Sequence, residues 1–129
     1  MARVFLLLAA FGGFTGVALG AFAAHGLKAR LSAEYLAVFQ TGTHYQLVHS
    51  LALLAVALLC LHAPQPLLRV SGLLFALGIL LFSGSLYLLT LTGISKLGMI
   101  TPLGGLAFLG CAIVFASHLS RQSARRLFF

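Results

Sequence analysis

Four long apolar runs limit what this chain can fold into. They cover residues 4–24, 44–62, 67–91 and 98–119, and about 20 apolar residues are enough for an α-helix to cross the hydrocarbon core of a bilayer. Only 7% of the residues are charged and 61% are hydrophobic, whereas a soluble domain has about 25% charged residues. We therefore expect residues 1–129 to form a single transmembrane domain, an all-α integral membrane four-helix bundle.

The charged residues lie at the ends of these runs. The chain has eight lysines and arginines against a single acid, Glu34, and such a balance also occurs in nucleic-acid-binding proteins. No element carries a basic stripe, however, and cations at the ends of spans are typical of contacts with anionic lipid headgroups. We expect membrane lipids as partners and no nucleic acid.

Four crossings place both termini on one side of the membrane. The cations of that side are Arg3, Arg69, Arg121, Arg125 and Arg126, and those of the other side are Lys28, Arg30 and Lys96. Because cytoplasmic loops carry an excess of lysine and arginine, five cations against three predict that the N- and C-termini are cytoplasmic.

The segment between the first two runs, about residues 32–43, has a mixed composition. Ser32 is a suitable helix cap, and Glu34 would lie in the first turn, where an acid is favourable. A helix from residue 32 to residue 62 would be about 46 Å long, more than the roughly 30 Å of the hydrocarbon core. We therefore predict a short amphipathic interfacial helix over 32–43, with a bend near Gly42 or a projecting first turn.

Small residues recur at spacings that let helices in lipid approach closely. The predicted packing positions are Gly12, Gly16 and Gly20 in the first run, Gly72 and Ala76 in the third, and Gly104 in the fourth. The GxxxG spacing in the first run can also mark a homodimer face. We favour packing within the bundle, and the sequence leaves the oligomeric state open.

Polar residues gather near alternate ends of the runs. In an up-and-down bundle, the end of the first helix, the start of the second, the end of the third and the start of the fourth meet at one membrane face. These ends carry His25, Thr41, His44, Tyr45, Gln46, His49, Ser83, Ser85, Tyr87 and Thr101. Unsatisfied polar groups are costly in hydrocarbon, so we predict that they form a polar cluster in one leaflet, the outer one.

Two interpretations of this cluster stay open. It could bind a small molecule, an ion or a lipid headgroup, because ionisable groups inside membranes are often functional. It could also be a set of hydrogen bonds that only holds the helices together. The histidines have no carboxylate partner in these runs, which favours the structural interpretation.

Catalytic and metal motifs are missing from the sequence. With Glu34 as the one acid, neither a pair of catalytic carboxylates nor a Ser-His-Asp triad can form. His44 and His49 are five residues apart, whereas two metal ligands on one helix need a spacing of four. We expect no enzyme activity, no metal and no cofactor.

Four segments carry a resemblance to a known family. They are residues 20–27 (GAFAAHGL), 39–54, 82–87 (FSGSLY) and 100–105 (ITPLGG). The chain resembles the small bacterial membrane proteins grouped as domain of unknown function 423, which are similar to eukaryotic transmembrane protein 256. The resemblance implies a four-helix protein of the bacterial cytoplasmic (inner) membrane. It supplies no settled biochemical function.

Our hypothesis from the sequence is a non-enzymatic membrane protein that binds a lipid headgroup or a partner membrane protein at the polar cluster. The alternative is a small transporter or channel subunit that acts as a homo-oligomer. A transport path needs polar groups across the whole membrane, whereas residues 51–61 and 73–81 are almost entirely apolar.

Overall fold

The computed structural model describes residues 1–128 of the chain, and within them every regular element is helical. The first rod is α1 (Ala2–Phe22), continued by a π-helical turn η1 (Ala23–Leu27). The second is α2 (Ala33–His62). The third comprises α3 (Pro66–Gly78), the π-helical turn η2 (Ile79–Ser83) and α4 (Gly84–Thr92), and the fourth begins with the 3-10 turn η3 (Ser95–Met99) and continues as α5 (Thr101–Leu127).

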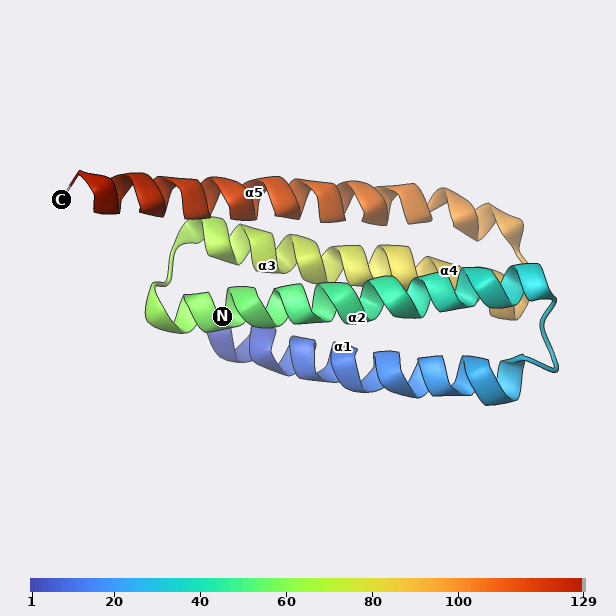
Figure 1. Ribbon diagram of the computed structural model, residues 1–129. Coiled ribbons are helices and arrows are strands. Elements are labelled where there is room, and N and C mark those ends of the chain that lie inside the picture. The colour runs from blue at the N-terminus through green and yellow to red at the C-terminus, as the bar shows by residue number, and fades with distance from the viewer. Residues whose placement is uncertain (129) are drawn as a thin grey trace.

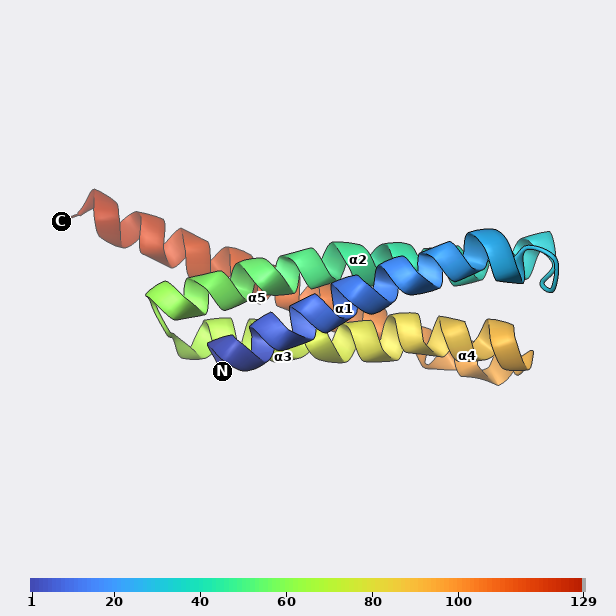
Figure 2. The same cartoon turned by 90° about the horizontal axis from the view of Figure 1, so that it is seen from below.

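The four rods run up and down beside one another (Figure 1). α1 packs on α2, α2 packs on the α3–η2–α4 rod, and α5 packs on α3 and η2. Both termini lie at the same end of the bundle, and α5 extends beyond the other helices there (Figures 1 and 2). We call this the terminal end and the opposite one the loop end.

Local sequence signals explain where the helices begin and end. Ser32 caps α2, because its Oγ accepts a hydrogen bond from the backbone nitrogen of Tyr35 at 3.2 Å. Pro66 occupies the first turn of α3, where the missing N–H costs nothing. α4 ends at Gly93, whose φ of 74° is in the left-handed region that glycine adopts freely.

The predicted interfacial helix over residues 32–43 is not seen as a separate element. α2 runs without interruption from Ala33 to His62, so residues 33–43 are its first turns and the helix continues through Gly42. Gly42 is instead buried against the ring of Tyr87, and its carbonyl accepts a hydrogen bond from Ser83. Contacts with α4 therefore keep this part of α2 in the bundle.

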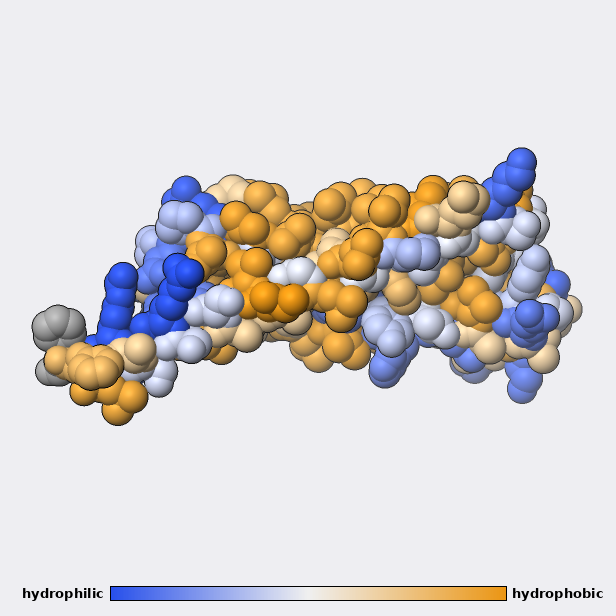
Figure 3. All heavy atoms as spheres, turned by 90° about the horizontal axis from the view of Figure 1, so that it is seen from above, coloured by the Kyte–Doolittle hydropathy of each residue, from blue (hydrophilic) through white to orange (hydrophobic). Residues whose placement is uncertain are grey.

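Apolar side chains cover the middle of the molecule. Figure 3 shows a mainly hydrophobic band with hydrophilic residues gathered toward both ends. Side chains such as Leu7, Leu51 and Leu80 are about 70% exposed, at 72%, 68% and 69%. All four rods are long and apolar enough to cross a membrane, and their lengths of 26, 30, 27 and 33 residues include the predicted spans. Which residues of these rods lie inside the bilayer stays a prediction.

Close helix contacts occur at most of the predicted small residues. Gly12 and Gly16 of α1 face Ser50 and Leu47 of α2, Gly72 faces Phe5, and Ala76 packs against the main apolar core. At Gly104 an added Cβ would meet the backbone of Phe82, not a side chain alone. The prediction for Gly20 is wrong, because no other residue lies within 4 Å of the place where its Cβ would be.

Candidate functional site

The side chain of Gln46, near the middle of α2, joins three helices. It is only 5% exposed. Its amide nitrogen donates to the carbonyl of Gly12 and to the hydroxyl of Thr15, both on α1 and both at 2.8 Å. Its amide oxygen accepts from the hydroxyl of Tyr87 on α4 at 2.6 Å. Gln46, Gly12, Thr15 and Tyr87 are called the Gln46 network below.

The hydrogen-bond donors of this network are all used. An amide nitrogen has two hydrogens to donate, and both are taken by α1. Thr15 also donates to the carbonyl of Phe11 at 2.7 Å. The Tyr87 hydroxyl donates its one hydrogen to Gln46, so its oxygen can still accept a bond from another group. The oxygens of Gln46 and Thr15 can each accept one more bond as well, so an added ligand would meet acceptors in this network but no free donor.

Two further contacts join helices near the loop end. The buried hydroxyl of Ser83, in η2, donates to the carbonyl of Gly42 in α2 at 2.7 Å. The hydroxyls of Ser85 and Thr101 lie 2.6 Å apart and link α4 to α5. All three of these side chains were predicted to belong to a polar cluster. Each of them bonds within the bundle.

The other predicted residues lie at the surface or at its edge. His25, Thr41 and His44 are exposed, and Tyr45 is 41% exposed. His49 is half-buried, and its ring stacks on Phe108 of α5 with centroids 3.6 Å apart. Its Nδ1 lies 2.8 Å from the carbonyl of Tyr45. The predicted set is thus divided between interior residues and a surface group, and no single cluster contains all ten residues.

Sequence reasoning missed the part of the network on α1. Thr15 is the one polar side chain between Arg3 and His25, and this isolation in an apolar run was a signal that could have found it. The Gly12 carbonyl gives no such signal. It is within reach of Gln46 because glycine has no side chain to hold the helices apart.

Beside the network, a groove opens between α1 and the α3–η2–α4 rod. We call it the central groove, and its volume is about 640 Å³. The lining residues are Leu8, Phe11, Gly12, Thr15, Leu19, Gln46, Leu53, Leu73, Ala76, Leu77, Ile79, Leu80, Gly84 and Tyr87. All four members of the Gln46 network line it together with mainly apolar residues. The groove therefore combines an apolar wall with a small polar area.

The part of the chain that the structure describes contains no cluster of side chains suited to bind a metal ion. Within residues 1–128, no three His, Cys, Asp or Glu side chains come close enough to hold an ion. Cys60 and Cys111 are both buried as free thiols. What the Gln46 network and the central groove can offer a ligand is hydrogen bonds and apolar contact.

Comparison with known proteins places the chain in a family. Residues 19–105 match the family described as "Protein of unknown function (DUF423)". The chain belongs to this family. The matched segment contains Gln46, Ser83 and Tyr87, whereas Gly12 and Thr15 precede it.

Several similar proteins are named as membrane proteins. The chain is 48% identical over 109 residues to "UPF0382 membrane protein YwdK" of Bacillus subtilis (strain 168), a match that covers 83% of this chain and 88% of the relative. It is 42% identical over 123 residues to "UPF0382 inner membrane protein YgdD" of Escherichia coli (strain K12), which covers 93% and 94%. No solved structure gives a significant match. With four long apolar helices of its own, the chain is a membrane protein of the UPF0382 family.

Proposed function

We propose that this protein binds a membrane lipid without catalysing a reaction. One hydrocarbon chain of the lipid occupies the central groove, and a hydrogen-bond donor of the same lipid reaches the Tyr87 hydroxyl. The observation that carries the proposal is the combination of an apolar groove with the Gln46 network along its wall.

The chemistry of the groove supports a lipid as the occupant. Its walls are built from leucines and other apolar residues of three rods, and a ligand that leaves the bilayer for this groove exchanges one apolar environment for another. Its polar part favours a ligand with one donor group, because Gln46 has no free hydrogen and Tyr87 has a free acceptor. A purely apolar chain would make no use of Tyr87.

Transport is less well supported than lipid binding. A path for polar solutes needs polar groups at successive depths across the membrane. Toward the terminal end the groove is lined by Leu8, Leu53, Leu73 and Leu77. These side chains suit hydrocarbon and give a hydrated solute no hydrogen bonds.

We also propose that the protein lies in the bacterial cytoplasmic membrane with both termini in the cytoplasm. The E. coli relative is named an inner membrane protein. Both termini lie at one end of the bundle (Figure 1), which also carries Arg3, Arg69 and the arginines of α5. Labelling of cysteines introduced at Ser123 and Ser95 with a membrane-impermeant thiol reagent tests this. Reaction at Ser95→Cys alone in intact cells is expected, and reaction at Ser123→Cys alone would contradict it.

Native mass spectrometry after gentle extraction tests the lipid proposal. The wild-type protein should carry a lipid adduct, and Gly84→Leu should lose it, because Gly84 lines the groove and no atom lies within 4 Å of its added Cβ. The leucine thus enters the groove from a position where its Cβ meets no other atom. Gly13→Leu is the matched control, since Gly13 is equally open but lies outside this groove.

Tyr87→Phe separates lipid binding from a purely structural network. It removes the hydroxyl and keeps the ring against Gly42 and Phe39. If the network binds a lipid donor, the variant retains less lipid or a different lipid class at the same protein mass. Equal lipid adducts in wild type, Gly84→Leu and Tyr87→Phe would refute the proposal.

A further inference from the structure

The Gln46 network can accept hydrogen bonds from a ligand but can donate none. Both amide hydrogens of Gln46 are taken by Gly12 and Thr15 on α1. The hydroxyl of Thr15 donates to the carbonyl of Phe11, and the hydroxyl of Tyr87 donates to the amide oxygen of Gln46. The side-chain oxygens of Gln46, Thr15 and Tyr87 each keep a free lone pair. A ligand that bonds to this network must therefore bring its own hydrogen.

The network lies about halfway between the charged ends of the rods. Arg3 and Lys28 are the charged residues on either side of Thr15 in the sequence. At roughly 1.5 Å per residue, Thr15 is about 18 Å from Arg3 and about 20 Å from Lys28 along the first rod. Along α2, Gln46 is about 18 Å from Glu34. Because the hydrocarbon core is about 30 Å thick, a bilayer that keeps these charges at its surfaces has the network close to its middle.

That depth excludes the headgroup of a phospholipid as the hydrogen-bond donor. The headgroup is charged, and moving a charge to the centre of a bilayer is costly. The uncharged part of a diacyl phospholipid consists of ester groups, whose oxygens only accept hydrogen bonds, and of hydrocarbon chains. A donor at this depth must belong to an uncharged lipid that carries it into the hydrocarbon core.

The central groove has room for an aromatic ring beside the network. Phe11 lies one turn before Thr15, lines the groove and is 67% exposed. Gly84 lies one turn before Tyr87 on the opposite wall, and the space where its Cβ would be is open. Aromatic rings pack well against one another in offset or tilted arrangements. A ligand ring between Phe11 and Gly84 can therefore pack on Phe11 while its hydroxyl bonds to the network.

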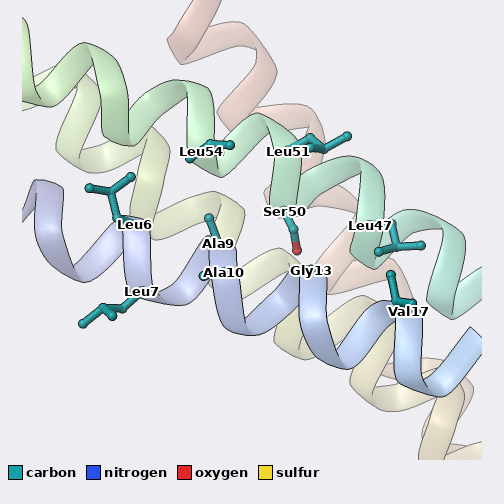
Figure 4. Close-up of a pocket in the computed structure, with 10 residues that line it drawn as sticks. All are labelled: Leu6, Leu7, Ala9, Ala10, Gly13, Val17, Leu47, Ser50, Leu51 and Leu54. Atoms are coloured by element: carbon teal, nitrogen blue, oxygen red, sulfur yellow. The ribbon is translucent and has the colours of Figure 1, made fainter.

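A second groove of the molecule lacks this combination. It is lined by residues of α1 and α2, and we call it the lateral groove (Figure 4). Its volume is about 820 Å³, and Ser50 is the one polar residue that lines it. The Ser50 hydroxyl is buried against Gly12 inside the contact between α1 and α2. Hydrocarbon fits both grooves, and of the two only the central groove can select a ligand by its hydrogen-bonding groups.

We infer that the central groove binds a prenylated hydroquinone and discriminates against the corresponding quinone. This inference rests on the proposed binding of a lipid in that groove. The hydroquinone is uncharged, its chain is apolar, and its aromatic hydroxyls donate hydrogen bonds. The quinone has nearly the same shape, but its carbonyl oxygens only accept and would face the acceptors of the network. Occupancy of the groove then follows the ratio of the reduced to the oxidised form in the membrane.

Binding of the two redox forms to the full chain tests this inference. The probes are a short-chain prenylated benzoquinol, kept reduced under anaerobic conditions, and the same compound oxidised to the benzoquinone. In a titration followed by native mass spectrometry, the wild type should bind the quinol about tenfold more tightly, the ratio that one hydrogen bond supplies. Gly84→Leu should lose the quinol, whereas Gly13→Leu, an equally open glycine in the lateral groove, should keep it.

Thr15→Val gives a result that a purely structural network would not give. Valine has nearly the shape of threonine but no hydroxyl, so one amide hydrogen of Gln46 loses its acceptor and becomes free to donate. The quinone then meets a donor, and the preference for the quinol should fall about tenfold. Thr41→Val is the matched control, since Thr41 is exposed and lies outside the groove. It should keep the wild-type preference.

The outcomes separate this inference from the proposed function. Equal binding of quinol and quinone to the wild type would overturn the inference and leave lipid binding intact, as would a phospholipid adduct that Gly84→Leu loses. Quinol binding that is unchanged in Gly84→Leu, or a preference that is unchanged in Thr15→Val, would also overturn it. If neither probe binds and the wild type carries no lipid adduct, both proposals fail.

Discussion

The loop end and the terminal end of the bundle are held together differently. Toward the loop end, hydrogen bonds between side chains and neighbouring helices centre on Gln46 and Ser83. Toward the terminal end, the main apolar core packs around Phe5, Leu68 and Val56. In the part of the chain described here, the interhelical side-chain bond of that core is the longer one from Ser71 to the carbonyl of Cys111, at 3.4 Å.

This difference shows what stabilises helices in an apolar solvent. Moving a leucine from lipid into a protein core brings little hydrophobic gain, because both surroundings are apolar. The terminal end must therefore rely on shape, as where the ring of Phe5 packs against Gly72. Shape also matters at the loop end, where Gly104 approaches the backbone of Phe82. The loop end adds hydrogen bonds that have no alternative partner in hydrocarbon. Substitutions at the two ends should consequently have different effects.

The largest effect is expected from Gly104→Ala. The new Cβ would overlap the backbone of Phe82, which cannot move aside as a flexible side chain can, so we expect a loss of about 3 kcal/mol of stability. Thermal unfolding in detergent can be followed with a thiol-reactive dye, because Cys60 and Cys111 are buried until the bundle opens. Gly105→Ala is the control, with its nearest atom at 3.9 Å. Equal melting temperatures for the two variants would show that shape does not limit packing here.

Gln46→Leu should have the next largest effect. It removes three interhelical hydrogen bonds and leaves the Tyr87 hydroxyl without its acceptor, for a loss of about 2 kcal/mol. Gln40→Leu makes the same change at an exposed position of the same helix. The dye assay should separate the two variants clearly. A stability of Gln46→Leu equal to that of Gln40→Leu would mean that the loop end is also held by packing alone.

Ser83→Ala should cost less, about 0.6 kcal/mol, the typical value of one interhelical hydrogen bond in a membrane. The hydroxyl that is lost bonds the Gly42 carbonyl of a different helix. Ser117→Ala is a suitable control, since that hydroxyl bonds Ile113 in its own helix at 2.8 Å. Because the expected difference is small, chemical denaturation is a better measurement than a melting temperature. No difference from Ser117→Ala would remove Ser83 from the interactions that hold the loop end.

His44→Ala should have the smallest effect, within about 0.5 kcal/mol of the wild type, because the substituted side chain is at the surface. The same result is expected for His25→Ala. These variants test whether the loop end depends on its interior network or on all of its polar residues. Unfolding at a temperature as low as that of Gln46→Leu would favour the second possibility.

Part of the Gln46 network could be predicted from the sequence. Its members Gln46 and Tyr87 are polar residues near the ends of apolar runs, buried and half-buried respectively, and the buried Ser83 beside the network is of the same kind. His25 and His44 meet the same description and are exposed. The buried and the exposed residues are alike in being polar and in lying near the end of an apolar run. What separates them is the rotation of each helix about its own axis, which composition does not specify.

The sequence by itself determined that the chain is helical and how many long apolar rods it has, because these properties depend on local composition. It also marked the cap at Ser32 and the turn at Gly93, but it did not show that residues 33–43 continue into the second rod. Only the tertiary structure decided which face of each rod points inward. Contacts between residues far apart in the chain, such as Gly104 with Phe82 and Gln46 with Gly12, set the rotation of the helices. The π-helical turns at η1 and η2 alter the regular 100° step between residues as well, so a polar residue can be found from the sequence but its direction cannot.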